Sequence, residues 1–101
     1  MEVVKLLLIW DINEGNEEEY FEFHVRRLVP TLDRMGITLQ EAWLTVFGVK
    51  PRMTVEAIIP NLEIAREIIY SEEWKLLTEQ LSAVVNNFDY KLLKAKRGIQ
   101  L

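Results

Sequence analysis

The stretch LQEAWLTVFGVKPRMTVEAII, residues 39–59, decides the fold because it reads as two strands joined by a turn. Residues 39–47 are rich in β-prone types, and residues 52–59 place apolar side chains at odd positions and mostly polar ones at even positions. Between them, residues 48–51 (GVKP) contain the glycine and proline that are typical of turns. The centre of the chain is therefore predicted to be a β-hairpin.

A strand and a helix are predicted before the hairpin. Residues 3–12 form a short apolar run that ends at an Asn-Glu-Gly-Asn turn, which predicts a strand with a uniformly apolar even face. A helix should follow, with Asn16 as its N-cap and Gly36 as its C-terminal glycine. Pro30 lies inside this helix and predicts a kink or a break near Val29. The apolar stripe of the helix comprises Phe21, Val25, Leu28, Leu32 and Met35.

Two helices and a last strand are predicted after the hairpin. Asn61 is expected to cap a short helix, and Ser71 to cap a second one, so the helical region should bend at Ser71. The second helix should end at residues 86–87 (NN), before a strand over residues 90–96. Its apolar stripe comprises Trp74, Leu77, Leu81, Val84, Val85 and Phe88.

The element order is thus β-α-β-β-α-β, which predicts an α+β, ferredoxin-like fold. Two right-handed crossovers around a hairpin give a four-stranded antiparallel sheet with the helices on one face. At 101 residues, the chain is expected to form a single domain, residues 1–101. The other sheet face should carry Leu7, Ile9, Trp43 and Phe47, which predicts a homodimer through the sheet faces, a dimeric α/β barrel. The alternative is a monomer whose additional apolar residues fill a deep core.

Composition argues against several classes of function. Twelve basic residues stand against sixteen acidic ones, for a net charge of −4, so nucleic-acid binding is not expected. Residues 94–97 (KAKR) are the one basic patch, either a solvated strand end or a contact for an anionic partner. No apolar run approaches the roughly 20 residues that span a membrane. The absence of cysteine favours a cytoplasmic location and argues against thiolate chemistry, and neither a metal nor a cofactor is expected.

Residues 41–81, EAWLTVFGVKPRMTVEAIIPNLEIAREIIYSEEWKLLTEQL, carry a resemblance to a known family. They combine a hairpin bearing aromatic residues, a strand ending in proline, and a helix broken before an acidic-acidic-Trp step. In this pattern the chain resembles the NIPSNAP-like branch of the dimeric α/β-barrel superfamily, over nearly its whole length. Relatives in that superfamily include antibiotic-biosynthesis monooxygenases, muconolactone isomerase, polyketide cyclases and haem-handling enzymes. The resemblance implies a face-to-face dimer without specifying a reaction.

His24 and Tyr20 are the candidate catalytic residues. His24 is the only histidine, and Tyr20 lies one helical turn before it on the same side. A histidine exchanges protons near neutral pH, so this pair could carry acid–base chemistry. The structural alternative is a histidine on the helix surface or at the core edge.

Three tryptophans and one glutamate are the candidate ligand-binding residues: Trp10, Trp43, Glu56 and Trp74. The tryptophans would line a pocket between sheet and helices that suits a flat organic molecule, or they would be ordinary core residues. Glu56 would be a buried general base, or it would pair with Lys5 or Arg52.

Two functional hypotheses follow. The first is a cofactor-independent enzyme of the monooxygenase, isomerase or cyclase type that acts on a small aromatic or apolar ligand. The second is a non-catalytic dimeric module that binds a ligand or a partner. A cavity of about several hundred cubic ångströms facing His24 and Tyr20 would support the enzyme, and a packed sheet–helix interface would argue against it.

Overall fold

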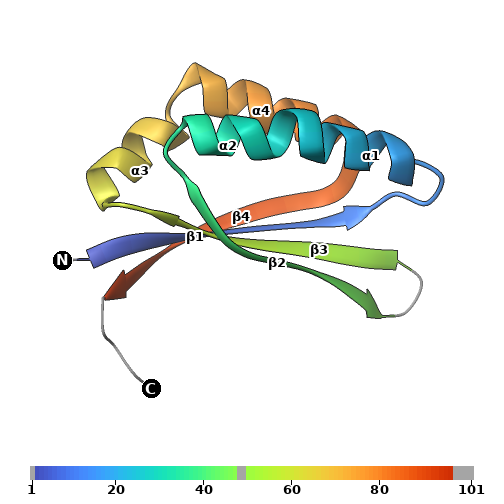
Figure 1. Ribbon diagram of the computed structural model, residues 1–101, viewed down its shortest axis with the longest axis horizontal. Coiled ribbons are helices and arrows are strands. Elements are labelled where there is room, and N and C mark those ends of the chain that lie inside the picture. The colour runs from blue at the N-terminus through green and yellow to red at the C-terminus, as the bar shows by residue number, and fades with distance from the viewer. Residues whose placement is uncertain (1, 48–49, 97–101) are drawn as a thin grey trace.

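Four strands form one antiparallel sheet in the order β2-β3-β1-β4, which confirms the predicted ferredoxin-like topology. The computed structural model describes residues 2–47 and 50–96 (Figure 1). The hairpin pairs β2 with β3, and β1 lies between β3 and β4. The strands are β1 (Glu2–Ile12), β2 (Thr38–Phe47), β3 (Lys50–Ile59) and β4 (Val85–Lys96).

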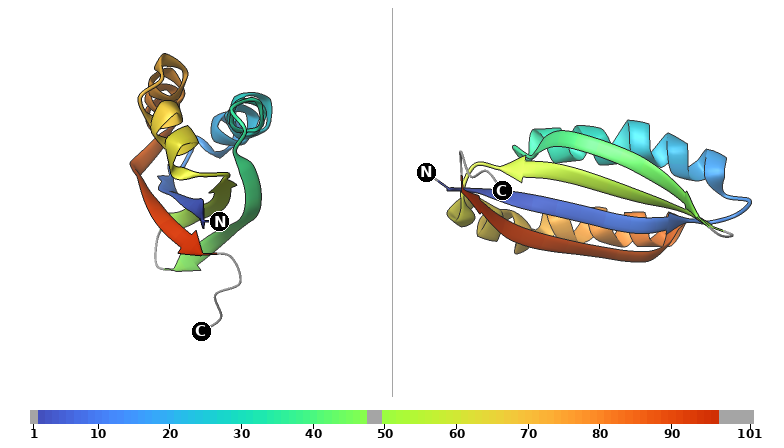
Figure 2. Two further views of the ribbon diagram at one scale, coloured as in Figure 1. Left: turned by 90° about the vertical axis from the view of Figure 1, so that its left-hand side faces the viewer. Right: turned by 90° about the horizontal axis from the view of Figure 1, so that it is seen from below.

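The helices all lie on one side of the sheet and leave its other face uncovered (Figure 2). The first crossover is one continuous helical segment of three parts, α1 (Glu17–Phe23), η1 (His24–Leu28) and α2 (Val29–Arg34). The second crossover contains α3 (Leu62–Ile69) and α4 (Glu72–Val84). In the described part of the chain, no helix is long and apolar enough to cross a membrane.

The core lies between this helical layer and the sheet, where the predicted alternation is confirmed. The even positions of β1 and the odd positions of β3 face the helices, because paired residues of adjacent strands share a face. The buried apolar residues of the strands are Val4, Leu6, Leu8, Trp10, Ile12, Val55, Ala57, Ile59 and Val85. The helices contribute Tyr20, Leu28, Leu32, Ala65, Ile68, Trp74, Leu77 and Leu81.

Pro30 does not break the first crossover helix, so of the two predicted outcomes near Val29 the break is wrong. Residues 24–28 instead adopt a π-helical turn, in which the Val29 N–H donates to the His24 carbonyl. A widened turn relieves the clash that a proline ring makes with the carbonyl four residues before it. The turn also shifts the buried side of the helix. Tyr20 is buried, whereas the predicted stripe residues Phe21 and Val25 are 45% and 67% exposed.

Two of the three predicted N-caps are confirmed. The Asn61 carboxamide oxygen accepts from the Ile64 N–H at 2.9 Å, and the Ser71 hydroxyl accepts from the Trp74 N–H at 3.1 Å. Asn16 occupies the cap position of α1, but its side chain makes no capping hydrogen bond. Gly36 ends α2 with φ +86°, a left-handed conformation that suits glycine.

β4 begins five residues earlier than predicted, since α4 ends at Val84. Val85 therefore belongs to the strand, and residues 86–87 lie at an irregularity in the β1–β4 pairing instead of ending a helix. Asn87 has φ +57° there, and its amide donates to the Asp11 carboxylate at 2.8 Å. Residues 48–49 of the predicted turn and Arg97 of the basic patch lie outside the described residues.

Asp11 fixes this irregularity, and its replacement should destabilise the fold. The carboxylate is 7% exposed and joins three strands, because it also accepts from Arg52 Nε at 2.8 Å. We expect Asp11→Ala to lower the free energy of unfolding by about 1–3 kcal/mol, because the Asn87 amide loses its acceptor. The control is Asp89→Ala, since Asp89 is exposed and accepts from the neighbouring Tyr90 N–H. Equal urea midpoints for the two variants would contradict this role.

Candidate functional site

Tyr20 and His24 form a hydrogen-bonded pair on the first crossover helix. The Tyr20 hydroxyl lies 3.1 Å from His24 Nδ1, and the two ring centroids are 5.7 Å apart. Tyr20 is fully buried in the middle of α1, and His24 is half-buried at the start of η1. One helical turn separates the two residues, which places both side chains on one side of the helix, as predicted.

Burial sets the protonation state of this pair. Burial raises the pKa of Tyr20 to about 12, and the adjacent indole of Trp10 offsets part of that rise. Burial also lowers the pKa of His24 below its ordinary value. Near neutral pH the pair is therefore a neutral phenol beside a neutral imidazole.

A series of contacting aromatic rings connects the Tyr20–His24 pair to the region between α4 and β4. Trp10 contacts Tyr20 at a centroid distance of 6.0 Å and Phe88 at 6.3 Å. Phe88 lies 6.1 Å from Tyr90, which in turn lies 5.2 Å from Trp74. Sequence reasoning named neither Phe88 nor Tyr90 as a site residue, and it assigned Phe88 to a helical stripe although Phe88 lies in β4. The signal that could have found them is two aromatic residues two positions apart, which lie on one face of a strand.

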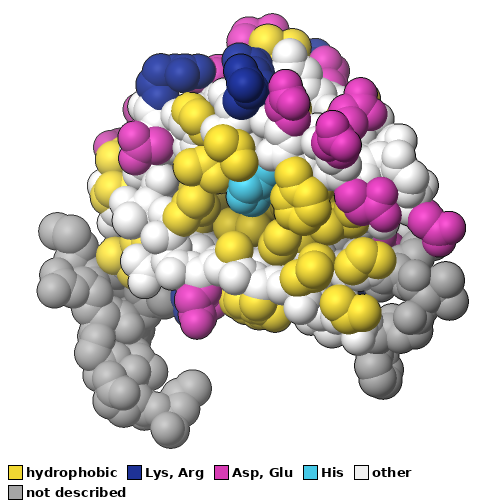
Figure 3. Space-filling model, turned by 45° about the vertical axis from the view of Figure 1, so that its right-hand side comes forward, with side chains coloured by type: hydrophobic (Ala, Val, Ile, Leu, Met, Phe, Trp, Pro, Cys, Tyr) yellow, Lys and Arg dark blue, Asp and Glu magenta, His cyan; other side chains and the backbone are white. Residues whose placement is uncertain are grey.

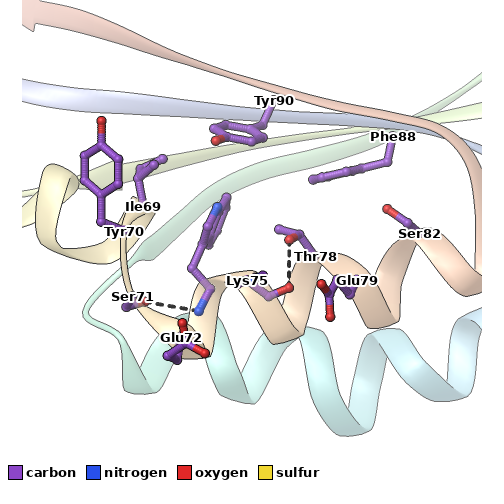
Figure 4. A pocket seen from close by; sticks show the side chains of 11 residues that line it. Ile69, Tyr70, Ser71, Glu72, Lys75, Thr78, Glu79, Ser82, Phe88 and Tyr90 are labelled. Carbon is purple, nitrogen blue, oxygen red and sulfur yellow. Dashed lines mark hydrogen bonds between the residues drawn. The ribbon is translucent and has the colours of Figure 1, made fainter.

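A groove of about 580 Å³ runs between α4 and β4. Figure 4 shows the rings of Phe88 and Tyr90 over the groove from the strand side, opposite Thr78 and Ser82 of α4. Trp74, a predicted ligand-binding residue, also lines it, as does Tyr70. The polar lining includes Glu72, Lys75 and Glu79.

The interior beneath the helices is filled. The space enclosed by β1, the first crossover helix and α4 holds a cavity of only about 10 Å³. Its lining residues include Leu8, Leu28, Leu32 and Leu77. A cavity of this size barely admits one water molecule, so the sheet–helix interior here has no room for a ligand.

Glu56 and Trp43 lie on the sheet face that points away from the helices. Trp43 pairs with Thr54, and Thr54 faces away from the helices because the next residue, Val55, is buried beneath them. The Glu56 carboxylate lies 3.2 Å from the Lys5 ammonium, which confirms the predicted pairing with Lys5. The structure therefore brings Trp10, Tyr20 and His24 together but separates them from Glu56 and Trp43.

His24 lies in an apolar patch at the surface. Figure 3 shows the imidazole among hydrophobic side chains, with most charged side chains further out. Phe21 and Val25 are exposed apolar residues of the helical segment that carries His24, and Leu44 and Val46 are exposed on the helix-facing side of β2. We call these four residues and His24 the His24 patch. Within residues 2–47 and 50–96, no three His, Asp or Glu side chains are placed to share a metal ion.

Solved structures share this fold at low sequence identity. A NIPSNAP family protein from Agrobacterium tumefaciens aligns with a TM-score of 0.66 and 15% identity over 96% of this chain and 89% of that chain. An EthD (ethyl tert-butyl ether d) family protein from Bacillus halodurans gives 0.64 and 14%, over 94% and 98%. A putative antibiotic biosynthesis monooxygenase from Caulobacter crescentus gives 0.69 and 8%, over 94% and 91%.

These likenesses confirm the fold that the sequence pattern suggested. NIPSNAP family proteins and a putative antibiotic biosynthesis monooxygenase are both among the structural neighbours. One of the NIPSNAP family neighbours is itself described as having unknown function. No protein-family model and no curated protein sequence matches the chain.

Proposed function

We propose that this protein binds a small, flat aromatic or apolar molecule in the groove between α4 and β4, and that it does so without turnover. The observation that carries the proposal is the groove itself, because its walls hold Tyr70, Trp74, Phe88 and Tyr90 in about 580 Å³. Pockets for small organic ligands typically measure about 300–1,000 Å³ and are lined by aromatic side chains.

The chemistry of the groove favours binding over catalysis. Two of its polar groups are already engaged, since the Ser71 hydroxyl caps α4 and the Thr78 hydroxyl donates to the Lys75 carbonyl. No histidine lines the groove, and His24 lies in a separate patch. The wall instead offers stacked and edge-on rings, which hold flat molecules by apolar contact.

Filling the groove should abolish ligand binding. Ser82 is exposed and lines the groove, whereas the next residue, Ala83, is exposed and is not part of its lining. We expect Ser82→Phe to weaken binding of 2-naphthol by about tenfold or more, and Ala83→Phe to leave it unchanged. The measurement is a titration followed by amide shifts in α4 and β4. If both variants bind like the wild type, the groove is not the site.

The proposal includes a cytoplasmic homodimer formed through the open sheet faces. Leu7, Ile9 and Ile58 are half-exposed at the centre of this face, and Trp43 and Leu93 are each 44% exposed toward its edges. A face with this much apolar surface would be covered in a twofold dimer. The lack of cysteine supports the cytoplasmic location.

Catalysis at His24 is the second candidate function, and one observation favours it. The imidazole reaches the surface in an apolar patch, while Tyr20 fixes it from below at 3.1 Å. An oriented imidazole in an apolar setting is a group that acid–base enzymes use. Neither Tyr20 nor His24 lines the groove or the small interior cavity, so a substrate for this pair would bind at the His24 patch.

A further inference from the structure

We propose that His24 is a hydrogen-bond donor, through Nε2, for the carbonyl oxygen of an uncharged apolar molecule bound at the His24 patch. This assigns a second ligand site, separate from the groove between α4 and β4. It also gives His24 the opposite role to a general base, because the ring nitrogen available to a ligand carries the proton. The assignment follows from the hydrogen bond that the buried Tyr20 makes.

The direction of the hydrogen bond between Tyr20 and His24 follows from the burial of the Tyr20 hydroxyl. The Tyr20 hydroxyl is fully buried, and a buried hydroxyl needs an acceptor for its proton. His24 Nδ1, at 3.1 Å, is the acceptor that the described part of the chain provides. The nearby Trp10 indole cannot take this role, because its N–H is a donor only. Tyr20 therefore donates to Nδ1.

The second step concerns the tautomer of His24. A neutral imidazole carries one proton, and the nitrogen that accepts a hydrogen bond is the one without it. With Nδ1 accepting from Tyr20, the proton lies on Nε2. In the described residues Nε2 has no hydrogen-bond partner, so its N–H is available to a ligand. Burial of both rings supports the neutral state of the pair.

The third step concerns the class of ligand. Figure 3 shows hydrophobic side chains around the imidazole, and the four apolar residues of the His24 patch are all exposed. Apolar surroundings make it costly to desolvate a charged group, whereas a neutral carbonyl exchanges one hydrogen bond with water for one with the protein. Of the charged residues that follow His24 on this helix, Arg26 lies 3.6 Å from Glu22, and Arg27 donates to the Gln80 carboxamide oxygen at 2.7 Å. An apolar ketone or ester therefore fits the patch better than a carboxylate.

The tautomer can be tested directly, because the chain has a single histidine. We expect ¹⁵N NMR at about pH 7.5 to show His24 Nε2 protonated and Nδ1 unprotonated. Tyr20→Phe removes the hydroxyl and should give a mixture of both tautomers. A proton on Nδ1 in the wild type, or an unchanged tautomer in the variant, would overturn the assignment.

The ligand class is tested with two probes of one shape, acetophenone and isopropenylbenzene, of which only the first has a carbonyl oxygen. Acetophenone should shift the His24 Nε2–H signal and bind about three- to tenfold more tightly than isopropenylbenzene. His24→Phe should remove this preference, and His24→Gln, which keeps an N–H donor, should restore part of it. Equal binding of both probes, or the same preference in His24→Phe, would refute the site.

The groove variants separate the two proposals. Ser82→Phe should leave the acetophenone response at His24 unchanged, because the groove lies between α4 and β4. Loss of the His24 response in Ser82→Phe would mean that the probe binds in the groove, which would overturn the second site. Failure of 2-naphthol to bind the groove would leave the His24 measurements unaffected.

Discussion

Replacing Trp10 by alanine should lower the free energy of unfolding by about 3–5 kcal/mol, the largest effect that we expect of a single substitution. Trp10 is fully buried near the end of β1 and touches both Tyr20 and Phe88. Its removal leaves a cavity between the sheet and the helices that neighbouring rings cannot fill without leaving their own contacts. Denaturation by guanidinium, followed by circular dichroism, measures the change.

Trp43→Ala is the matched control, since Trp43 is 44% exposed on the open sheet face. We expect this variant to lose less than about 1 kcal/mol in the monomer at low protein concentration. A similar loss for both variants would contradict the central role of Trp10. Trp10→Phe keeps a ring at this position and should retain the fold, so it shows whether the His24 tautomer depends on the indole.

Leu7→Glu should abolish the proposed dimer. Leu7 lies on the open sheet face, opposite Glu56 of β3 and Lys91 of β4. A twofold dimer would bury two copies of the new carboxylate, one from each subunit, and each would add to the negative charge of Glu56 with only Lys91 opposite it. We expect the dissociation constant to rise by about a hundredfold or more, because bringing like charges together in a buried interface costs several kcal/mol.

Sedimentation equilibrium measures this effect, with Leu76→Glu as the control. Leu76 is a 51% exposed leucine on α4, on the helical side of the molecule. It should tolerate the charge and sediment like the wild type. A wild-type chain that sediments as a single 11.9 kDa species at high concentration would refute the dimer.

Features that depend on local sequence were predictable. The hairpin and the caps at Asn61 and Ser71 follow from residues within a few positions of each other. The start of β4 was not predictable, because the apolar residues within 84–88 fit the spacing of a helix and are also residue types that favour a strand. Pairing with β1 decides in favour of the strand, since Val85 pairs with Ile12 there.

In the candidate site, too, local contacts could be predicted from the sequence and contacts between distant elements could not. Tyr20 and His24 are one turn apart on a helix, so their contact could be predicted from spacing alone. Glu56 and Trp43 were expected at the pocket, but strand parity places them on the other face. Parity alone cannot show that Phe88 and Tyr90 meet Trp74, because that contact requires the packing of α4 on β4.

The π-helical turn at residues 24–28 also absorbs one residue more than an ordinary helical turn. Its hydrogen bond spans five residues instead of four, so the helix before the turn keeps its orientation relative to Leu28 although the sequence there is one residue longer. For this reason Tyr20 is buried where an unbroken α-helical pattern would bury Phe21. Loss of one residue from within the turn, after His24, should therefore leave an ordinary α-helix with Tyr20 still in the core.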